Sequence, residues 1–290
     1  MGRICGLLLS ILLTACAQPP AQPGPVEGPT IVSLNPCADA ILAEVADPGQ
    51  LLAISSYSHN PASSSMDAAT ARRFRATDGT VEEIIALNPD LVIDGNYTAP
   101  ATKAALARLG LRLEQLPIAS TADASLAQVR QLAALAGHPE RGEVLVRRIE
   151  AALAAAASPG PPVSAVVWQS GGIVAGQGTL IDDLLRRTGF SNLATARGLG
   201  QADMLPLEAM LVQPPRVIFA AGNERANEDR LLRHPALSGL RGTMRARLDP
   251  ALLWCGGPTI EKAAGRLAAV RRSVETQGEP GLTRSAGLAR

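Results

Sequence analysis

One pattern occurs twice in this sequence, and it constrains the fold more than any other feature. Residues 81–93 and residues 207–219 both read as an apolar helical stretch with a glutamate near its start, a proline stop and a short strand of buried type. Units that alternate helix and strand build parallel sheets with helices on both faces. The repeat therefore predicts two similar α/β lobes.

A long helical region separates the two copies. Residues 124–157 have a helical pattern that is broken once, at Gly137-His138-Pro139, and residues 158–162 (Ser-Pro-Gly-Pro-Pro) stop the second piece. At 1.5 Å per residue the second piece is about 28 Å long. We expect this long, rigid helix to join two Rossmann-like lobes with parallel sheets. The ligand cleft is then expected between the lobes, outside the carboxyl ends of their strands.

The other elements follow from hydrophobic periodicity and helix caps. Thr80 and Glu83 form a capping box at the start of the first repeated helix, and residues 56–77 read as polar, irregular chain. The predicted strands span residues 31–34, 51–55, 91–93, 111–116, 165–169, 217–220 and 252–254. The further predicted helices span residues 37–46, 100–109, 180–188 and 259–274.

The amino terminus reads as an export signal. A basic residue precedes the apolar run 4–13, which is too short to span a bilayer stably, and small residues follow it. Residues 13–16 (Leu-Thr-Ala-Cys) look like a lipobox, in which Cys16 is lipidated and becomes the mature amino terminus. The alternative is ordinary cleavage after Ala17. Residues 17–29 are rich in Pro, Gln and Gly, which is typical of a disordered tether.

Export leaves two cysteines in the folded part of the chain, Cys37 and Cys255. Each is predicted to follow a strand and precede a helix, one in each lobe. In an oxidising compartment a disulfide across the cleft would tie the lobes together and restrict their opening. Free thiols that contact a soft metal centre of the ligand are one alternative, and two unpaired buried side chains are the other.

Charge and motifs argue against several classes of protein. The net charge is +1 without a basic stripe, so nothing indicates a nucleic-acid partner. The sequence has no Gly-x-Ser-x-Gly elbow and no P-loop. We therefore do not expect an enzyme, and we expect neither a cofactor nor a resident metal. An exported hydrolase is the alternative from a different class.

Several motifs follow one another in a fixed order along residues 30–272. They are residues 31–36, the first repeat copy, residues 178–185 with Gly189 and Asn192, the second repeat copy, and His234-Pro235. In this order and spacing the chain resembles the substrate-binding proteins of ATP-driven importers for cobalamin, iron–siderophores and haem. The resemblance implies an ABC permease as partner, the ATPase subunits behind it, and a monomeric binding protein.

The resemblance also implies docking roles for Glu82 and Glu208. In relatives one exposed glutamate on each lobe meets arginines of the permease. Because Glu83 takes part in the capping box, Glu82 is left to point outward, and paired carboxylates suit bidentate arginine partners. The alternative is that acidic residues merely favour the first turn of a helix.

The strand ends supply the candidate ligand-binding residues. The chain has only two Trp, two Tyr and three Phe, yet both Tyr and one Trp fall at predicted strand ends. Aromatic rings in a cleft can pack against a flat or macrocyclic ligand. The alternative is that these rings only pack at the ends of each lobe's hydrophobic core. Trp168, inside a strand, is expected in the core. The candidates are Asn35, Pro36, Cys37, Tyr57, His59, Asn96, Tyr97, Ser170, Gly171, Trp254 and Cys255.

The expected ligand is a small metal chelate, either a corrinoid (cobalamin-like) or an iron chelate. Haem- or siderophore-specific binding within the same family is the alternative, and a ligand sensor or adhesin on this fold is a third interpretation. Three histidines are too few for the zinc- and manganese-binding relatives, and His59 is either solvated or a ligand to the metal of the chelate. The nearest candidates for an arginine cluster are Arg72, Arg73 and Arg75.

The expected location is the periplasm or another extracytoplasmic space, with a lipid anchor in the membrane. The predicted organisation comprises a signal peptide (1–15), a disordered tether (16–29), an amino-terminal lobe (30–122), connecting helices (123–160), a carboxyl-terminal lobe (161–276) and a flexible tail (277–290).

Overall fold

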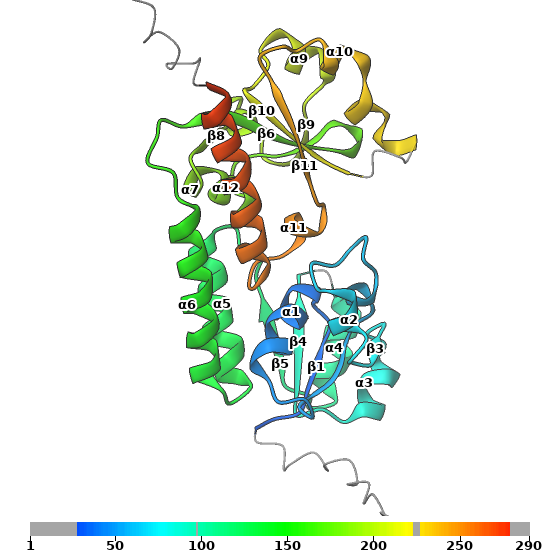
Figure 1. The fold of residues 1–290 in the computed structure, drawn as a ribbon. Coiled ribbons are helices and arrows are strands. Elements are labelled where there is room, and N and C mark those ends of the chain that lie inside the picture. Colours follow the sequence, from blue (N-terminus) through cyan, green and yellow to red (C-terminus); the bar gives the residue numbers. More distant parts are fainter. Residues whose placement is uncertain (1–27, 97, 223–226, 279–290) are drawn as a thin grey trace, which may run out of the picture.

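The computed structural model describes residues 28–96, 98–222 and 227–278. Within these ranges it contains two α/β lobes, one below the other in Figure 1, with long helices along one side of both. The predicted fold class, two lobes on either side of a helical connection, is confirmed.

The amino-terminal lobe is built on a five-stranded parallel sheet with the strand order β3-β2-β1-β4-β5. Its strands are β1 (Ile31–Ser33), β2 (Leu51–Ser55), β3 (Ala76–Thr77), β4 (Leu91–Gly95) and β5 (Leu113–Leu116). Its helices are α1 (Pro36–Val45), η1 (Ser56–His59), α2 (Ala68–Ala71), α3 (Val81–Leu87) and α4 (Pro100–Arg108). The central strands β1 and β4 are buried along their whole length, as their apolar sequences predict.

The carboxyl-terminal lobe has a six-stranded sheet with the order β11-β10-β6-β7-β9, and β8 pairs with β6. Its strands are β6 (Val163–Gln169), β7 (Ile173–Ala175), β8 (Phe190–Asn192), β9 (Gln201–Met204), β10 (Val217–Ala221) and β11 (Met244–Leu248). Its helices are η2 (Ser170–Gly172), α7 (Leu180–Arg187), α8 (Leu193–Ala196), α9 (Leu207–Val212), η3 (Asn227–Arg233), α10 (Pro235–Ser238) and α11 (Ala251–Trp254).

This second sheet is mixed, so the prediction of parallel sheets in both lobes is wrong for it. β7 runs antiparallel to β6 and to β9. The cause is the tight turn after β6, where Gly171 and Gly172 adopt positive φ angles of 72° and 86° and send the chain straight back.

Three helices form a layer that spans both lobes (Figure 1). α5 and α6 pack against each other as a helical hairpin, and α12 packs on α6. Gly142 of α6 permits close approach, since a Cβ there would lie 2.5 Å from the Cβ of Ala133. The predicted connecting helices correspond to α5 (Ala122–Leu135) and α6 (Pro139–Ala156), and α12 (Thr259–Gly278) completes a three-helix layer with them.

The hydrophobic core is continuous through this layer. One cluster of buried side chains includes Ile31 of β1, Val129 of α5, Val146 of α6, Leu267 of α12 and Val217 of β10. Smaller clusters fill the outer faces of the two sheets. Because close-packed interiors resist deformation, the shared core holds the two lobes in a defined relative position.

The repeat that predicts the two lobes is confirmed. α3 leads into β4 in one lobe and α9 leads into β10 in the other, with a proline between helix and strand in each. Ile84 and Met210, which occupy equivalent positions, are both fully buried beneath their helices. The Thr80 side chain accepts the Glu83 N–H at 3.2 Å, as the capping motif predicts.

The chain after β10 departs from the prediction. Residues 252–254, predicted as a strand, lie in α11, and the edge strand is the preceding β11. Asp249 accepts the Ala251 N–H at 3.0 Å, and Pro250 directs the chain into a helical turn. An apolar run as short as Leu-Leu-Trp does not by itself distinguish helix from strand.

Candidate ligand cleft

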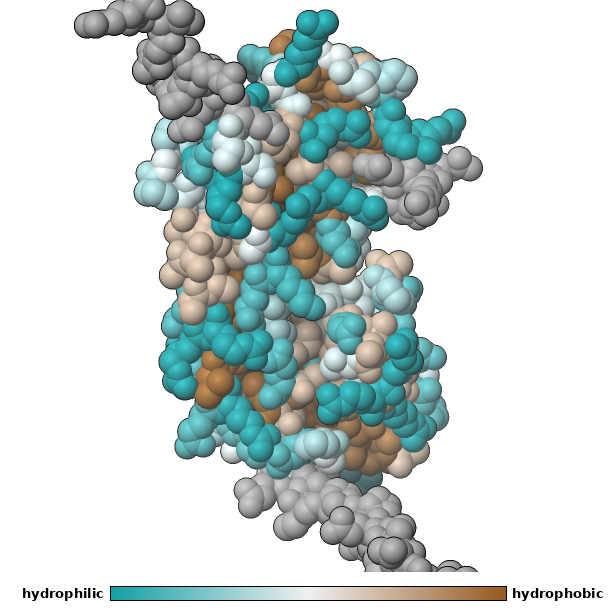
Figure 2. All heavy atoms as spheres, viewed as in Figure 1, coloured by the Kyte–Doolittle hydropathy of each residue, from teal (hydrophilic) through white to brown (hydrophobic). Residues whose placement is uncertain are grey.

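The two lobes meet at α11 and the loops of the amino-terminal lobe below it (Figure 1). The carboxyl end of β11 leads into α11, and the carboxyl end of β1 leads into α1 beneath it. On the side away from α5 and α6, the surface is hollowed between the lobes (Figure 2). Ligands of open α/β sheets bind outside the carboxyl ends of the strands, so this hollow is the candidate ligand cleft.

Asn35 and Pro36 start helix α1 at the floor of the junction. The Asn35 Oδ1 accepts the N–H groups of Cys37 and Ala38 at 2.9 and 3.3 Å, and Pro36 occupies the first helical position. The Asn35 amide also packs on Gly95, where a Cβ would lie 2.9 Å from Nδ2. Both predicted site residues therefore have a structural role, and any contact they make with a ligand stays a prediction.

Tyr57 and His59 lie in η1, directly after β2. The Tyr57 side chain is 64% exposed. His59 is also exposed, and its Nε2 lies 3.2 Å from the Phe74 carbonyl oxygen.

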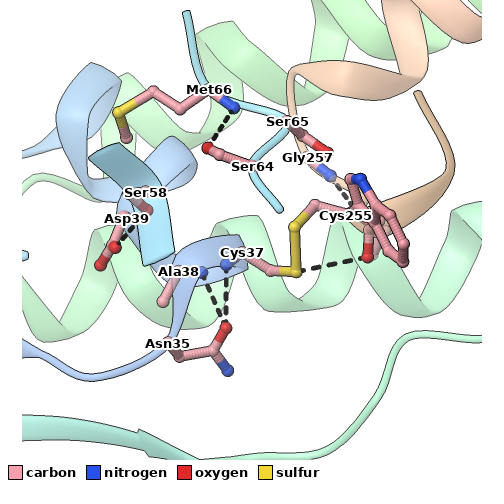
Figure 3. The surroundings of a disulfide bond; sticks show 12 residues. Asn35, Cys37, Ala38, Asp39, Ser58, Ser64, Ser65, Met66, Cys255 and Gly257 are labelled. Carbon is pink, nitrogen blue, oxygen red and sulfur yellow. Dashed lines mark hydrogen bonds between the residues drawn. A yellow bond between two sulfur atoms is a disulfide. The ribbon is translucent and has the colours of Figure 1, made fainter. Parts of the chain in front are cut away.

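Asp39 of α1 holds the segment that carries Tyr57 and His59 through two hydrogen bonds. The Asp39 Oδ2 accepts the Ser55 N–H at 3.0 Å and the Ser58 hydroxyl at 2.6 Å (Figure 3). Its other oxygen, Oδ1, is buried and has no hydrogen-bond partner among the described residues. Burial raises the pKa of the Asp39 carboxyl from 3.8 to about 7, against the opposing effect of its hydrogen bonds.

The end of β4 carries a charge pair next to Asn96. The buried Asp94 carboxylate lies 3.0 Å from the Lys103 Nζ, which also donates to the Gly95 carbonyl at 3.0 Å. Asn96 is exposed and accepts from Gln115 at 3.4 Å. Tyr97 lies outside the described residues.

The two tryptophans have opposite environments. Trp168 is fully buried and its Nε1 donates to the Leu205 carbonyl at 3.1 Å, so its predicted place in the core is confirmed. Trp254 is 49% exposed and is the last residue of helix α11, whereas it was predicted at the end of a strand. Ser170 and Gly171 form the turn between β6 and β7, with Gly171 exposed.

Cys37 and Cys255 form a disulfide across the lobe junction, with their Cα atoms 5.1 Å apart (Figure 3). Of the three predicted alternatives, the structure contains the bridge, and the thiols are not free to contact a ligand. Cys255 follows helix α11, so its predicted position after a strand is wrong.

Backbone contacts reinforce the bridge. The Ser65 hydroxyl donates to the Ala251 carbonyl at 2.5 Å, and the Gly257 N–H donates to the Ser125 hydroxyl at 2.7 Å. Gly257 also packs tightly on α1, since a Cβ there would lie 2.6 Å from Ile41. The segment 251–257 is thereby fixed to the amino-terminal lobe and to α5.

An arginine-lined groove in the carboxyl-terminal lobe has no counterpart among the predicted site residues. It has a volume of about 400 Å³ and is lined by Ala220, Arg233, Arg245, Ala246 and Arg247. The predicted cluster at Arg72, Arg73 and Arg75 lies in the other lobe, where all three are exposed. The alternation Met-Arg-Ala-Arg-Leu at residues 244–248 is the pattern of a half-buried strand, and it was the available signal for this groove.

Glu82 and Glu208 occupy equivalent positions in the first turns of α3 and α9. Both are exposed, and neither has an ion pair or a hydrogen bond of its side chain within the described ranges. Glu83 accepts from the Thr77 hydroxyl at 2.7 Å and from the Asp78 N–H at 3.0 Å, which leaves Glu82 unconstrained as predicted.

The described residues contain neither a cluster of metal ligands nor a membrane-spanning helix. No cluster of three or more His, Cys, Asp or Glu side chains there could hold a metal ion. No helix in the same ranges is long and apolar enough to cross a membrane. The predicted lipidation site Cys16 lies outside them.

Solved structures with the same fold include three periplasmic binding proteins. The haem-binding protein RhuT of Roseiflexus sp. RS-1 has a TM-score of 0.66 and 22% identity, covering 87% of this chain and 100% of its own. The vitamin B12 binding protein BtuF of Vibrio cholerae has a TM-score of 0.66 and 19% identity, and the match covers 86% of this chain and 98% of BtuF. The haem-binding protein HutB of the same organism has a TM-score of 0.68 and 18% identity, and the match covers 83% of this chain and 98% of HutB.

Sequence comparison identifies the family itself. No curated protein matches the chain. The family described as periplasmic binding protein matches residues 31–244, which is most of the chain and includes both lobes. This protein therefore belongs to the periplasmic binding protein family.

Proposed function

We propose that this protein binds a metal chelate between its lobes, either a corrinoid or an iron chelate, and delivers it to the permease of an ABC importer. Membership of the family makes the chain an extracytoplasmic solute-binding component of such an importer. The chelate is supported by the names of the similar structures, which are described as haem-binding and vitamin B12 binding proteins.

The observation that carries the proposal is the exposure of two large rings, one directly after β2 and one at the end of α11. Tyr57 is 64% exposed and Trp254 is 49% exposed, whereas Trp168, Phe190 and Phe219 are buried in the core. Leaving a large apolar surface in water forgoes about 1.5–3 kcal/mol per side chain. A flat ligand that covers these rings would recover that free energy.

The two rings come from segments that are held together. Tyr57 lies in η1, and the chain that follows η1 includes Ser65, whose hydroxyl donates to the Ala251 carbonyl at the start of α11. Trp254 is the last residue of α11. The disulfide at Cys255 fixes the other side of Trp254. Rings that are held by neighbouring, tethered segments can contact one ligand with little loss of conformational entropy.

Delivery to the permease is assigned to Glu82 and Glu208. Both carboxylates are exposed at equivalent positions of the two lobes, so they can accept two basic side chains at a fixed separation. The lipobox-like sequence that ends at Cys16 supports a lipid anchor, which would keep the binding protein near the membrane.

The test is a titration of the purified protein with cobalamin, cobinamide, a ferric siderophore and haem, followed by tryptophan emission. We expect at least one of them to bind and to quench Trp254. Replacement Trp254→Ala is expected to weaken that binding by about 1–3 kcal/mol, the scale of burying one large side chain.

Val144→Ala, at an exposed apolar position of α6, is the matched control and should leave affinity unchanged. Binding of none of the four ligands would contradict the metal-chelate proposal. Binding with unchanged affinity in Trp254→Ala would mean that this ring only covers the junction.

A further inference from the structure

The short helix η1 carries two of the candidate site residues at the surface of the amino-terminal lobe. Tyr57 is 64% exposed and His59 is exposed, whereas Ser58 between them is buried. The Tyr57 and His59 side chains therefore point outward, while the Ser58 side chain points into the lobe. The contacts that hold η1 in place decide where the Tyr57 ring lies.

Asp39 of α1 holds η1 from inside the lobe. Its Oδ2 accepts the Ser55 N–H at 3.0 Å, just before η1, and the Ser58 hydroxyl at 2.6 Å, so the two bonds bracket Tyr57. Figure 3 shows Asp39 and Ser58 facing each other. The first turn of α1 is itself fixed, because Cys37 in that turn carries the disulfide. A separation of the two elements therefore moves η1 and leaves α1 in place.

The Asp39 carboxyl is buried among uncharged groups. Asp39 has an exposed fraction of 0%, and its Oδ1 has no hydrogen-bond partner among the described residues. Burial is the largest cause of its shifted pKa, which it raises to about 7, and no charged side chain contributes to the shift. The carboxyl therefore exchanges its proton near neutral pH.

The charged side chains on the elements packed against α1 face other groups. On η1, the His59 Nε2 lies 3.2 Å from the Phe74 carbonyl oxygen, and the Tyr57 ring is exposed. β1 and β2 contain no charged residue. The charged residues of α5 and α6 and the other acidic residue of α1 form ion pairs of 2.7–2.8 Å or are exposed. The pairs are Arg141–Asp47, Arg148–Glu44, Arg130–Glu143 and Arg187–Asp123, and the exposed residues are Glu140, Arg147 and Glu150.

We propose that Asp39 is a proton-controlled positioning residue, which keeps η1 closed on α1 when it is protonated and lets η1 open when it is ionised. A protonated carboxyl can stay buried with its two hydrogen bonds, whereas an ionised one needs water at Oδ1. Water can enter from the side of η1, because η1 lies at the surface and β1 and β2 are buried in the sheet. The position of Tyr57 then follows the pH. This inference goes beyond the proposed function, and its test needs no ligand, so each of the two can fail without the other.

Opening of η1 releases the proton of Asp39. In the closed state burial raises the pKa of Asp39 to about 7, and in the open state the hydrated carboxyl returns toward its ordinary value of 3.8. The closed state is therefore favoured at low pH and loses this advantage as the pH rises through about 7. We expect the population of the open state to rise about tenfold or more between pH 5 and pH 8.

The experiment is amide hydrogen exchange of the ligand-free protein between pH 5 and pH 8, followed by mass spectrometry. Exchange of the peptide that spans residues 55–60 is compared with the rate of an unstructured chain at each pH, which gives the protection of this segment. Protection in the wild type should fall about tenfold or more as the pH rises. Asp39→Asn, whose amide resembles the protonated acid, should keep its protection throughout. Asp39→Ala lacks both hydrogen bonds and should be weakly protected at every pH.

His59→Gln is the matched control, because histidine is the other side chain of η1 that can change its charge in this range. It should keep the pH dependence of the wild type. Circular dichroism at each pH verifies that all variants are folded. Equal profiles of wild type and Asp39→Asn, or a profile that becomes flat in His59→Gln, would overturn the inference. Exchange as slow as that of the buried strand β10 at every pH would also overturn it, because η1 would then open only when the whole protein unfolds.

Discussion

Asp39 illustrates how a single buried residue supports the candidate site. It has no exposed atom to interact with a ligand, yet its Oδ2 holds the segment that carries Tyr57 and His59. Burial raises its pKa to about 7, because the charged form has lost its hydration. Sequence alone gave no hint of this role, since an acidic residue in the first turn of a helix is ordinarily read as a favourable interaction with the helix dipole.

The raised pKa predicts a specific dependence of stability on pH. Between pH 3.8 and about 7 the folded state keeps a proton on Asp39 that the unfolded state releases, so this group stabilises the fold most at low pH. Its contribution is lost as the pH rises through about 7. Asp39→Asn, whose amide oxygen can still accept from Ser55 and Ser58, should therefore lose less stability than the wild type between pH 5 and pH 8.

Urea unfolding at the two pH values measures this difference, which is on the order of a few kcal/mol at most. Asp78→Asn, at an exposed carboxyl, is the control and should follow the wild type. Parallel pH profiles of wild type and Asp39→Asn would show that Asp39 is ionised throughout and contradict the assignment.

Among the elements, the segment from Asp249 to Gly257 does most to define the junction. It contains α11, the exposed Trp254 and the bridged Cys255, and it contacts α1, the loop at Ser65 and α5. It belongs in sequence to the carboxyl-terminal lobe and packs on α12, and it is also bonded to the amino-terminal lobe. The disulfide makes this attachment covalent.

Removal of the disulfide is expected to weaken the whole fold. The bridge joins residues that are 218 positions apart, and long closed loops restrict the unfolded chain strongly. The double variant Cys37→Ser/Cys255→Ser should lose about 2–4 kcal/mol of unfolding free energy. Reduction of the wild type with a thiol reagent should produce the same loss, measured by urea unfolding. Unfolding curves that do not respond to reduction would contradict a structural role for the bridge.

The same segment shows where prediction from sequence ended. The long helix α6, with a proline at its start and a Pro-rich stop after it, and the short apolar strand β2 were predicted within a residue or two of their bounds. β11 and α11 were not, because an alternating strand with two arginines and a four-residue apolar helix have weak local signals. Since β11 carries Arg245 and Arg247, missing that strand also meant missing the groove.

At the scale of the whole molecule, the internal repeat was enough to predict two lobes. The repeat does not predict how the two lobes are arranged relative to each other. That arrangement depends on the packing of α12 against α6 and on one core that runs through both lobes. Arg148 of α6 adds an ion-pair bridge at that layer, to Glu44 of α1 at 2.7 Å and to Glu261 of α12 at 2.6 Å. Such long-range contacts leave no trace in a local pattern. The consequence is a molecule in which the lobes, and with them Glu82 and Glu208, are held at a nearly fixed separation.

We propose that this two-lobed protein binds its cargo in one place and hands it to the permease through another. A comparison of uptake with binding in Glu82→Ala/Glu208→Ala, with the cargo identified by titration, separates the two roles. We predict that the double variant abolishes uptake and keeps its affinity for the cargo within a few-fold. Single variants should be mild, because one exposed charge pair contributes about 0–1 kcal/mol. Uptake that survives in the double variant, or affinity that falls together with uptake, would contradict a docking role for the two glutamates.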